Sequence, residues 1–217
     1  MRGRRGGGGT FARGVILVVD VALGTVAAIV ALPVVVIAAL GSTVAFRAWP
    51  FVVQSRVGRH GRTFRFVKLR SLPRDTPPAI DKYALAEYRT SRWGRWLRAT
   101  HVDELPQLFL VPLRRMNLVG PRPEMVALID RYPADFAALR SAVHPGCTGL
   151  WQVSTASDQM IYEAPEYDTC FVECRSLRLN LWVLGQTLRV FFGGVHCSPE
   201  RIFGERGPCR TSRRGAR

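Results

Sequence analysis

The chain has 217 residues and carries 31 Lys or Arg against 16 Asp or Glu, a formal net charge of +15. This length fits one compact domain with an appendage. The charge suits nucleic acid, anionic lipid or phosphorylated substrates, and does not choose among them. The five cysteines lack the paired spacing and the His partners that would complete a zinc set. We expect them to be reduced, packed thiols.

A long apolar segment follows a Gly- and Arg-rich start. Residues 1–13 are expected to be disordered. Residues 14–46 are apolar apart from Asp20, and their uncharged part, about 26 residues, is long enough to cross the hydrocarbon layer as a helix. The run is too long for a cleaved signal peptide. The sequence therefore predicts a membrane-embedded helix over residues 14–46.

Pro33 lies near the middle of this segment and predicts a kink. Two arrangements remain open. A spanning helix would place its two ends on opposite sides of the membrane, whereas a re-entrant helical hairpin would bend at Pro33 and return both ends to one face. Arginines flank both ends, and positive residues prefer the cytoplasm, which favours the hairpin. We expect Asp20 to be an interfacial anchor that pairs with Arg13 or Arg47.

The remainder, residues 47–195, has the patterns of a mixed α+β domain. Residues 51–53 and 64–67 read as two strands joined by a Gly-containing turn, which predicts a small β-hairpin. Lys68 and Arg70 follow at alternate positions and so point to one side of a strand. That side is either a solvated edge or a phosphate-binding face.

Several amphipathic helices are expected after the hairpin. Residues 81–98 interleave Trp and Arg, which suits a membrane interface where rings and guanidinium groups meet lipid headgroups. Residues 124–139 form a second such segment, broken at Pro133. Residues 176–192 carry leucines at helical spacing, which is typical of core or of a helix on the bilayer. Residues 196–217 are expected to form a disordered basic tail.

An adjacent acid pair, Asp103 and Glu104, stands just before Pro106. Proline is favoured in the first turn of a helix, so the pair is predicted to open a helix. A helix N-terminus suits carboxylates and phosphates alike. Arg98 lies upstream and Arg122 downstream, in a Gly-Pro-Arg-Pro turn. A solvated helix start and a reactive acid pair are both compatible with this local pattern.

Three ordered blocks of sequence give a family resemblance. L-R-x-T-x-x-D-E-L-P-Q-L and M-N-L-V-G-P-R-P-E occupy the acid-pair region, V-G-R-x-G-x-x-F-x-x-x-K-L-R-S lies upstream, and H-P-G-C-T-G-L-W-Q-V-S lies downstream. The chain resembles the bacterial sugar transferases, specifically the monotopic polyprenyl-phosphate phosphoglycosyl transferases. It departs from them in having Leu32 rather than serine before Pro33, and Thr155-Ala156 where a Gly-Arg pair often stands.

The resemblance implies a function for the residues that match. It implies transfer of a sugar-1-phosphate from a UDP-sugar to a polyprenyl phosphate (undecaprenyl or decaprenyl) through a covalent intermediate, as the first membrane step of exopolysaccharide or glycoconjugate synthesis. It implies that Asp103 is the nucleophile, that Glu104 is its partner, and that both bind Mg²⁺. The residues expected to hold phosphates are Arg98, Lys68, Arg70 and Arg122, and Asp168 is a further active-site acid.

The resemblance also implies a re-entrant helix broken at Pro33, contact with membrane lipids, and a catalytic domain on the cytoplasmic face of a bacterial plasma membrane. A catalytically inactive membrane scaffold of the same fold is the alternative. A membrane-tethered nucleic-acid-binding module is a more distant one, and we expect no nucleic-acid partner because the long apolar run makes lipid the simpler one. The sequence leaves a homodimer open and does not identify the donor sugar.

Overall fold

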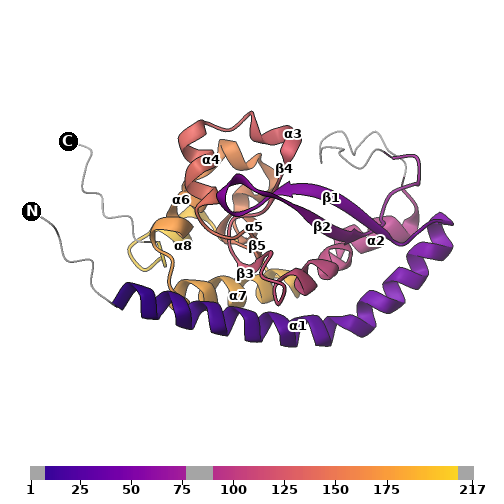
Figure 1. The fold of residues 1–217 in the computed structure, drawn as a ribbon, viewed down its shortest axis with the longest axis horizontal. Coiled ribbons are helices and arrows are strands. Elements are labelled where there is room, and N and C mark those ends of the chain that lie inside the picture. The colour runs from indigo at the N-terminus through magenta and orange to yellow at the C-terminus, as the bar shows by residue number, and fades with distance from the viewer. Residues whose placement is uncertain (1–7, 77–89, 210–217) are drawn as a thin grey trace, which may run out of the picture.

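The computed structural model describes residues 8–76 and 90–209, with side chains from residue 14 onward. Helices and strands are mixed, as the α+β expectation requires (Figure 1). The elements are α1 (Gly8–Phe46), β1 (Phe51–Val57), η1 (Arg59–Gly61), β2 (Thr63–Leu69), α2 (Arg92–Ala99), η3 (Val102–Leu110), β3 (Asn117–Val119), β4 (Glu124–Met125), α3 (Val126–Ile129), α4 (Ala134–Ser141), β5 (Gly146–Thr148), α5 (Leu150–Val153), η4 (Thr155–Asp158), η5 (Ile161–Glu163), α6 (Pro165–Glu173), α7 (Leu177–Phe191) and α8 (Pro199–Phe203).

Helix α1 is a single element of 39 residues that contains Pro33. It is the one helix among the described residues that is long and apolar enough to cross a membrane. Figure 1 shows that it curves along the edge of the domain and turns upward towards α2. The structure therefore does not confirm the expected hairpin, since the helix bends without breaking. A proline removes one intrahelical hydrogen bond, and a long helix can absorb that loss as curvature. The helix also begins at Gly8, so the disorder expected up to residue 13 is wrong for residues 8–13.

Polar and packing contacts attach α1 to the domain at two distant points. The buried carboxylate of Asp20 accepts a hydrogen bond from the backbone N–H of Leu118 at 3.0 Å. It forms no ion pair with Arg47, one of the two expected partners, and the side chain of the other, Arg13, lies outside the described part. Near the other end, the indole N–H of Trp93 donates to the Ser42 hydroxyl at 3.1 Å. Gly41 faces the Trp93 ring so closely that a Cβ there would clash with it. The domain thus lies alongside most of the helix.

The predicted β-hairpin is confirmed. β1 and β2 pair antiparallel, with Phe51 opposite Leu69 and Val57 opposite Thr63. The connection is a short 3₁₀ turn in which His60 and Gly61 have positive φ angles of 57° and 71°. β4 joins the free edge of β1, so the sheet order is β2-β1-β4, and β3 pairs with β5 in a separate parallel sheet. This brings the segment after Arg122 against the hairpin.

Helices occur within the predicted helical segments, and the structure does not test their expected place at a membrane interface. α2 begins only at Arg92, after the non-helical residues Thr90 and Ser91, so the predicted helix over residues 81–98 is found in its last part, and residues 81–89 lie outside the described part. α7 matches the last predicted helix within a residue at each end, with Leu179 and Val183 buried and Leu181, Leu188 and Phe191 exposed. The segment over residues 124–139 divides at Pro133 into α3 and α4, but its first two residues form β4.

The region after α7 differs from the expected disordered tail. The backbone of Cys197 forms an isolated parallel β-bridge with that of Ser154, and α8 follows. Ile202 and Cys209 are fully buried in the main hydrophobic core. Cys170 and Cys209 are joined by a disulfide, so the expectation of five reduced thiols is also wrong for this pair. A few apolar residues among Gly, Pro and Arg were enough to anchor the segment. Residues 210–217 lie outside the described part.

Candidate active site

The acid pair lies at the start of η3, immediately after α2. His101 has a left-handed backbone conformation with φ 55°, which turns the chain sharply between the two helices. η3 is a 3₁₀ helix rather than the expected α-helix. Its first-turn bond runs from the N–H of Glu104 to the carbonyl of His101. Pro106 has no N–H to offer the carbonyl of Val102, which disfavours α-helical bonding at this point.

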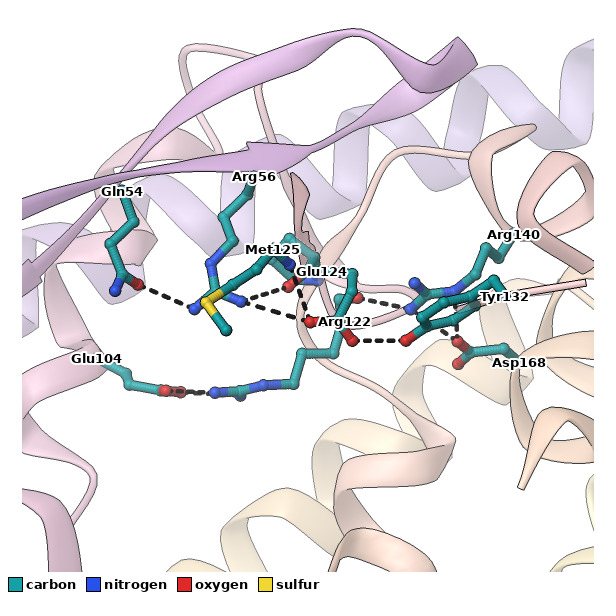
Figure 2. Close-up of polar contacts among 10 residues, drawn as sticks. Gln54, Arg56, Glu104, Arg122, Glu124, Met125, Tyr132, Arg140 and Asp168 are labelled. Atoms are coloured by element: carbon teal, nitrogen blue, oxygen red, sulfur yellow. Dashed lines mark hydrogen bonds and ion pairs between the residues drawn. The ribbon is translucent and has the colours of Figure 1, made fainter. Parts of the chain in front are cut away.

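Glu104 is tied to Arg122 by two parallel hydrogen bonds, as Figure 2 shows. The guanidinium nitrogens lie 3.0 and 2.5 Å from the two carboxylate oxygens. Burial alone would raise the pKa of Glu104, but the Arg122 charge and hydrogen bonds outweigh it and lower that pKa to about 2. The same pairing raises the pKa of Arg122. Glu104 is therefore a permanently ionised carboxylate in a fixed orientation.

Asp103 has a different environment, although it is the adjacent residue. Its side chain is buried, and among the described residues no cationic group lies within ion-pair distance of it. Its carboxylate accepts a hydrogen bond from the Ser71 hydroxyl at 3.5 Å. Burial first, and then repulsion by Glu104, raise the pKa of Asp103 to about 7. The two neighbouring acids thus differ strongly in proton affinity, a division that is typical of catalytic carboxylates.

Cationic side chains converge on the pair from three elements. The charges of Lys68, Arg98 and Arg122 all act to lower the pKa of Asp103. Lys68 comes from the end of β2, and Arg98 from the last turn of α2. Burial lowers the pKa of the Lys68 ammonium, and the carboxylates of Glu104 and Asp103 oppose that shift. The site therefore combines two carboxylates with a positive field, which suits a phosphate ester or diphosphate.

A second group of side chains supports Arg122 from the hairpin side (Figure 2). Arg56 donates to Gln54 at 2.9 Å and to the carbonyl of Pro123 at 3.3 Å, and its guanidinium lies 3.8 Å from Glu124. Tyr132 donates its hydroxyl proton to the other oxygen of Glu124. These contacts attach Pro123 and Glu124, the two residues after Arg122, to β1, so that the arginine reaches Glu104 from an anchored turn.

A buried ion pair supports Arg122 from the opposite side. Arg140 and Asp168 are almost completely buried, and the guanidinium donates to Asp168 at 3.0 and 3.1 Å. A further N–H of Arg140 donates to the backbone carbonyl of Arg122 at 2.7 Å. The guanidinium also lies over the Tyr132 ring, 5.0 Å from its centroid. Asp168 therefore communicates with the acid pair through Arg140 and the Arg122 backbone (Figure 2).

Five of the residues singled out in the sequence come together here: Asp103, Glu104, Lys68, Arg98 and Arg122. Arg70 does not join them, because it follows the end of β2 and its Nε donates to the carbonyl of Trp49 at 2.9 Å. Asp168 is connected to these residues only indirectly, through Arg140 and the backbone of Arg122. Nothing in the sequence indicated site roles for the four supporting residues, which are Arg56, Glu124, Tyr132 and Arg140. The one local sign that Arg140 is buried was its position one helical turn after Phe136, which is itself buried.

Several known proteins are similar to this chain in sequence. The family model described as "Bacterial sugar transferase" matches residues 11–194. A UDP-galactose-lipid carrier transferase of Erwinia amylovora is 36% identical over 151 residues, which is 62% of this chain and 31% of that protein. An undecaprenyl-phosphate galactose phosphotransferase of Salmonella typhimurium is also 36% identical over 151 residues, 62% of this chain and 32% of that protein.

A UDP-glucose:undecaprenyl-phosphate glucose-1-phosphate transferase of Caulobacter vibrioides is 35% identical over 144 residues, 62% of this chain and 54% of that protein. The chain thus spans about a third to a half of the length of these relatives. The family match covers far more of the present chain, and it includes the acid pair and every cationic residue around it. The chain belongs to the bacterial sugar transferase family.

Proposed function

We propose that this chain transfers a sugar-1-phosphate from a UDP-sugar to a polyprenyl phosphate, as the first membrane step of exopolysaccharide or glycoconjugate synthesis. The observation that carries the proposal is the pair of adjacent carboxylates with opposite properties, Glu104 clamped by Arg122 and Asp103 buried without a charged partner in the described structure. The relatives support the substrate class, because their names specify UDP-sugars and undecaprenyl phosphate.

In this proposal Asp103 is the nucleophile. Its carboxylate oxygen attacks the phosphorus that bears the sugar, and the bond from that phosphorus to the bridging oxygen breaks, so UMP leaves. An oxygen of the polyprenyl phosphate then attacks the same phosphorus and displaces the carboxylate. A carboxylate with a raised pKa is a better nucleophile than an ordinary one once it is ionised. Lys68, Arg98 and Arg122 stabilise the charge on the phosphoryl oxygens as the transition state forms.

The donor set fits Mg²⁺, which prefers one or two carboxylates together with substrate phosphate oxygens. Asp103 is a buried carboxylate whose pKa is raised by burial and by the Glu104 charge, and among the described residues no cation lies within ion-pair distance of it, so it is the group that a divalent ion would satisfy. Asp103 and Glu104 would hold the ion. When bound, it would neutralise the diphosphate and favour the ionised form of Asp103. Arg122 uses two N–H groups on Glu104, so its guanidinium keeps donors for a phosphate.

The way α1 is attached supports a membrane position on one face. The domain contacts the helix at Asp20 and again at Ser42, points about 33 Å apart along a helix axis. A helix that crossed the bilayer upright would carry this flanking domain, with its charged site, into a hydrocarbon layer about 30 Å thick. We infer that α1 is embedded from one side, with both ends and the domain on the cytoplasmic face. Its outward apolar residues, such as Val30, Ile37 and Val44, then contact lipid.

The direct test is UMP release. Purified full-length protein with Mg²⁺ and undecaprenyl phosphate is screened against a panel of UDP-sugars, with Asp103→Asn as the matched inactive control. Release of UMP from at least one donor, together with formation of a lipid-linked diphosphosugar, is expected. If no donor supports release while the protein is folded and binds vesicles, the inactive-scaffold alternative is the better account.

A further inference from the structure

The three cysteines Cys170, Cys174 and Cys209 lie together at the main hydrophobic core. Their sulfur atoms are all within 4.8 Å of one another. Cys170 and Cys174 lie one helical turn apart at the end of α6, where the N–H of Cys174 donates to the carbonyl of Cys170 at 2.8 Å. Cys209 arrives from the segment after α8. Cys170 and Cys209 are fully buried and disulfide-bonded, whereas Cys174 is partly exposed.

A disulfide uses two sulfurs and leaves the third unexplained. The other two free cysteines, Cys147 and Cys197, do not belong to the group. Among the described residues, this is the one group of three or more potential metal ligands whose donor atoms converge. Residues at i and i+4 of a helix present their side chains on the same face, which is the spacing that chelation by a helix requires. The arrangement therefore has the form of a ligand set.

The distances suit a thiophilic ion. Zinc binds thiolates at about 2.3 Å in tetrahedral geometry, which places the sulfurs of a site about 3.8 Å apart. Three sulfurs within 4.8 Å of one another reach that arrangement with small side-chain rotations once the disulfide is reduced. Soft thiolate donors select ions such as Zn²⁺ over Mg²⁺. The partial exposure of Cys174 leaves the fourth position to water.

We propose that Cys170, Cys174 and Cys209, in the reduced protein, form a binding site for a thiophilic divalent ion of the Zn²⁺ type. Binding releases the three thiol protons. Disulfides are rare in the cytosol, so the reduced form is the relevant one there. The expectation that the cysteines are reduced therefore rests on the cytoplasmic position of the domain, which is part of the proposed function. Formation of the site from the disulfide requires a two-electron reductant such as a cellular thiol or, in vitro, a phosphine, and yields two thiols.

The ion would fasten the last described segment to α6. That helix carries Asp168, two residues before Cys170, and Asp168 holds Arg140 beneath the Arg122 turn. The site would link these two segments through the bound ion. It replaces the covalent cross-link of the oxidised form by a coordinate one, and its loss is expected to loosen the C-terminal segment before it affects the acid pair.

The test measures metal binding and does not depend on activity, so its outcome is separable from that of the proposed function. Full-length protein in detergent is reduced with a phosphine, freed of reductant without oxygen, and titrated with Zn²⁺ against a chromophoric chelator and, separately, with Co²⁺. We expect one ion per chain and thiolate-to-cobalt charge-transfer absorption. Cys174→Ser should bind at least tenfold more weakly, with reduced charge-transfer intensity, whereas Cys147→Ser should match the wild type.

Cys174→Ser keeps both cysteines of the disulfide, so its fold can be verified in the oxidised state by the mass after alkylation and by circular dichroism. Wild-type protein that remains oxidised should bind no ion at this site. Two results would overturn the proposal: substoichiometric binding by the reduced wild type, or equal affinity in the wild type and Cys174→Ser. Either would leave Cys170 and Cys209 as a simple disulfide pair.

Discussion

Replacing Asp168 by Asn tests whether the buried ion pair supports the acid pair from a distance. The change keeps the shape of the side chain and removes the charge that compensates Arg140. Both side chains are almost completely buried, and the guanidinium is held by Asp168, by the Arg122 carbonyl and by the Tyr132 ring. Arg140 would remain buried without a counter-charge. Breaking such a pair costs about 3–5 kcal/mol of folding free energy.

For a chain of this size, that loss corresponds to a fall in melting temperature of about 6–20 °C. Thermal unfolding in one detergent at fixed pH, followed by tryptophan fluorescence, measures it. The matched double variant Asp168→Leu/Arg140→Met removes both charges, and we expect it to recover most of the lost stability. It should not recover turnover, because the Arg122 carbonyl still lacks its donor. We expect UMP release to stay about tenfold below wild type.

The reasoning would be refuted by either of two results. A melting temperature for Asp168→Asn within about 3 °C of the wild type would mean that Arg140 is not dependent on this charge, whatever its burial. Full activity in the double variant would mean that Arg122 keeps its position without Arg140. If Asp168→Asn lost stability but kept wild-type kinetics, the Arg140–Asp168 pair would contribute to folding alone.

The site and the helix give four further predictions. Arg122→Lys should lower kcat/KM about tenfold, or about 1.4 kcal/mol, because lysine cannot reproduce the two parallel bonds to Glu104; unchanged kinetics would refute this. Burial and the Glu104 charge raise the pKa of Asp103 to about 7 in the metal-free protein, and bound Mg²⁺ would favour the ionised carboxylate, so kcat/KM should rise with pH to a plateau and its acidic limb should move to lower pH as the Mg²⁺ concentration is raised; a limb that does not respond to Mg²⁺ would contradict this. The same raised pKa means that ionisation of Asp103 costs stability progressively as pH rises from about 4 to 7, so Asp103→Asn should melt higher than the wild type above pH 7 and equally below pH 4. Single cysteines introduced at Thr10 and Val57, in a background without the native thiols, should both be labelled from the cytoplasmic side alone; labelling from opposite sides would show a spanning helix.

The parts of the structure that depend on local pattern could be predicted from the sequence. Alternating apolar residues around a Gly-containing turn specified the hairpin of β1 and β2, and leucines at helical spacing specified α7. The acid pair and its nearest cations were found because they lie in compact motifs. Even there, the 3₁₀ form of η3 depends on the Pro106 position and on the left-handed turn at His101, which periodicity does not register.

Contacts between distant residues could not be predicted in this way. The bond from Leu118 to Asp20 joins residues 98 apart, and Arg140 meets Asp168 across 28 residues. No local period encodes either contact, so a nearby arginine was the simpler partner to assign to Asp20. The C-terminal segment shows the same limit, since its composition is that of a disordered tail, yet a few buried residues such as Ile202 anchor it in the core. At Pro33 the sequence predicted a kink and the resemblance implied a break, whereas α1 is one continuous helix that curves (Figure 1).

The central claim is that Asp103 becomes covalently bound to the phosphosugar, and intact-protein mass spectrometry tests it most directly. Enzyme incubated with Mg²⁺ and its UDP-sugar, without lipid acceptor, should release up to about one UMP per active site and gain the mass of one phosphosugar. Asp103→Asn should show neither, and added polyprenyl phosphate should remove the adduct from the wild type. A wild type that turns over yet never carries the adduct, and that releases UMP only when acceptor is present, would contradict the claim and indicate direct transfer.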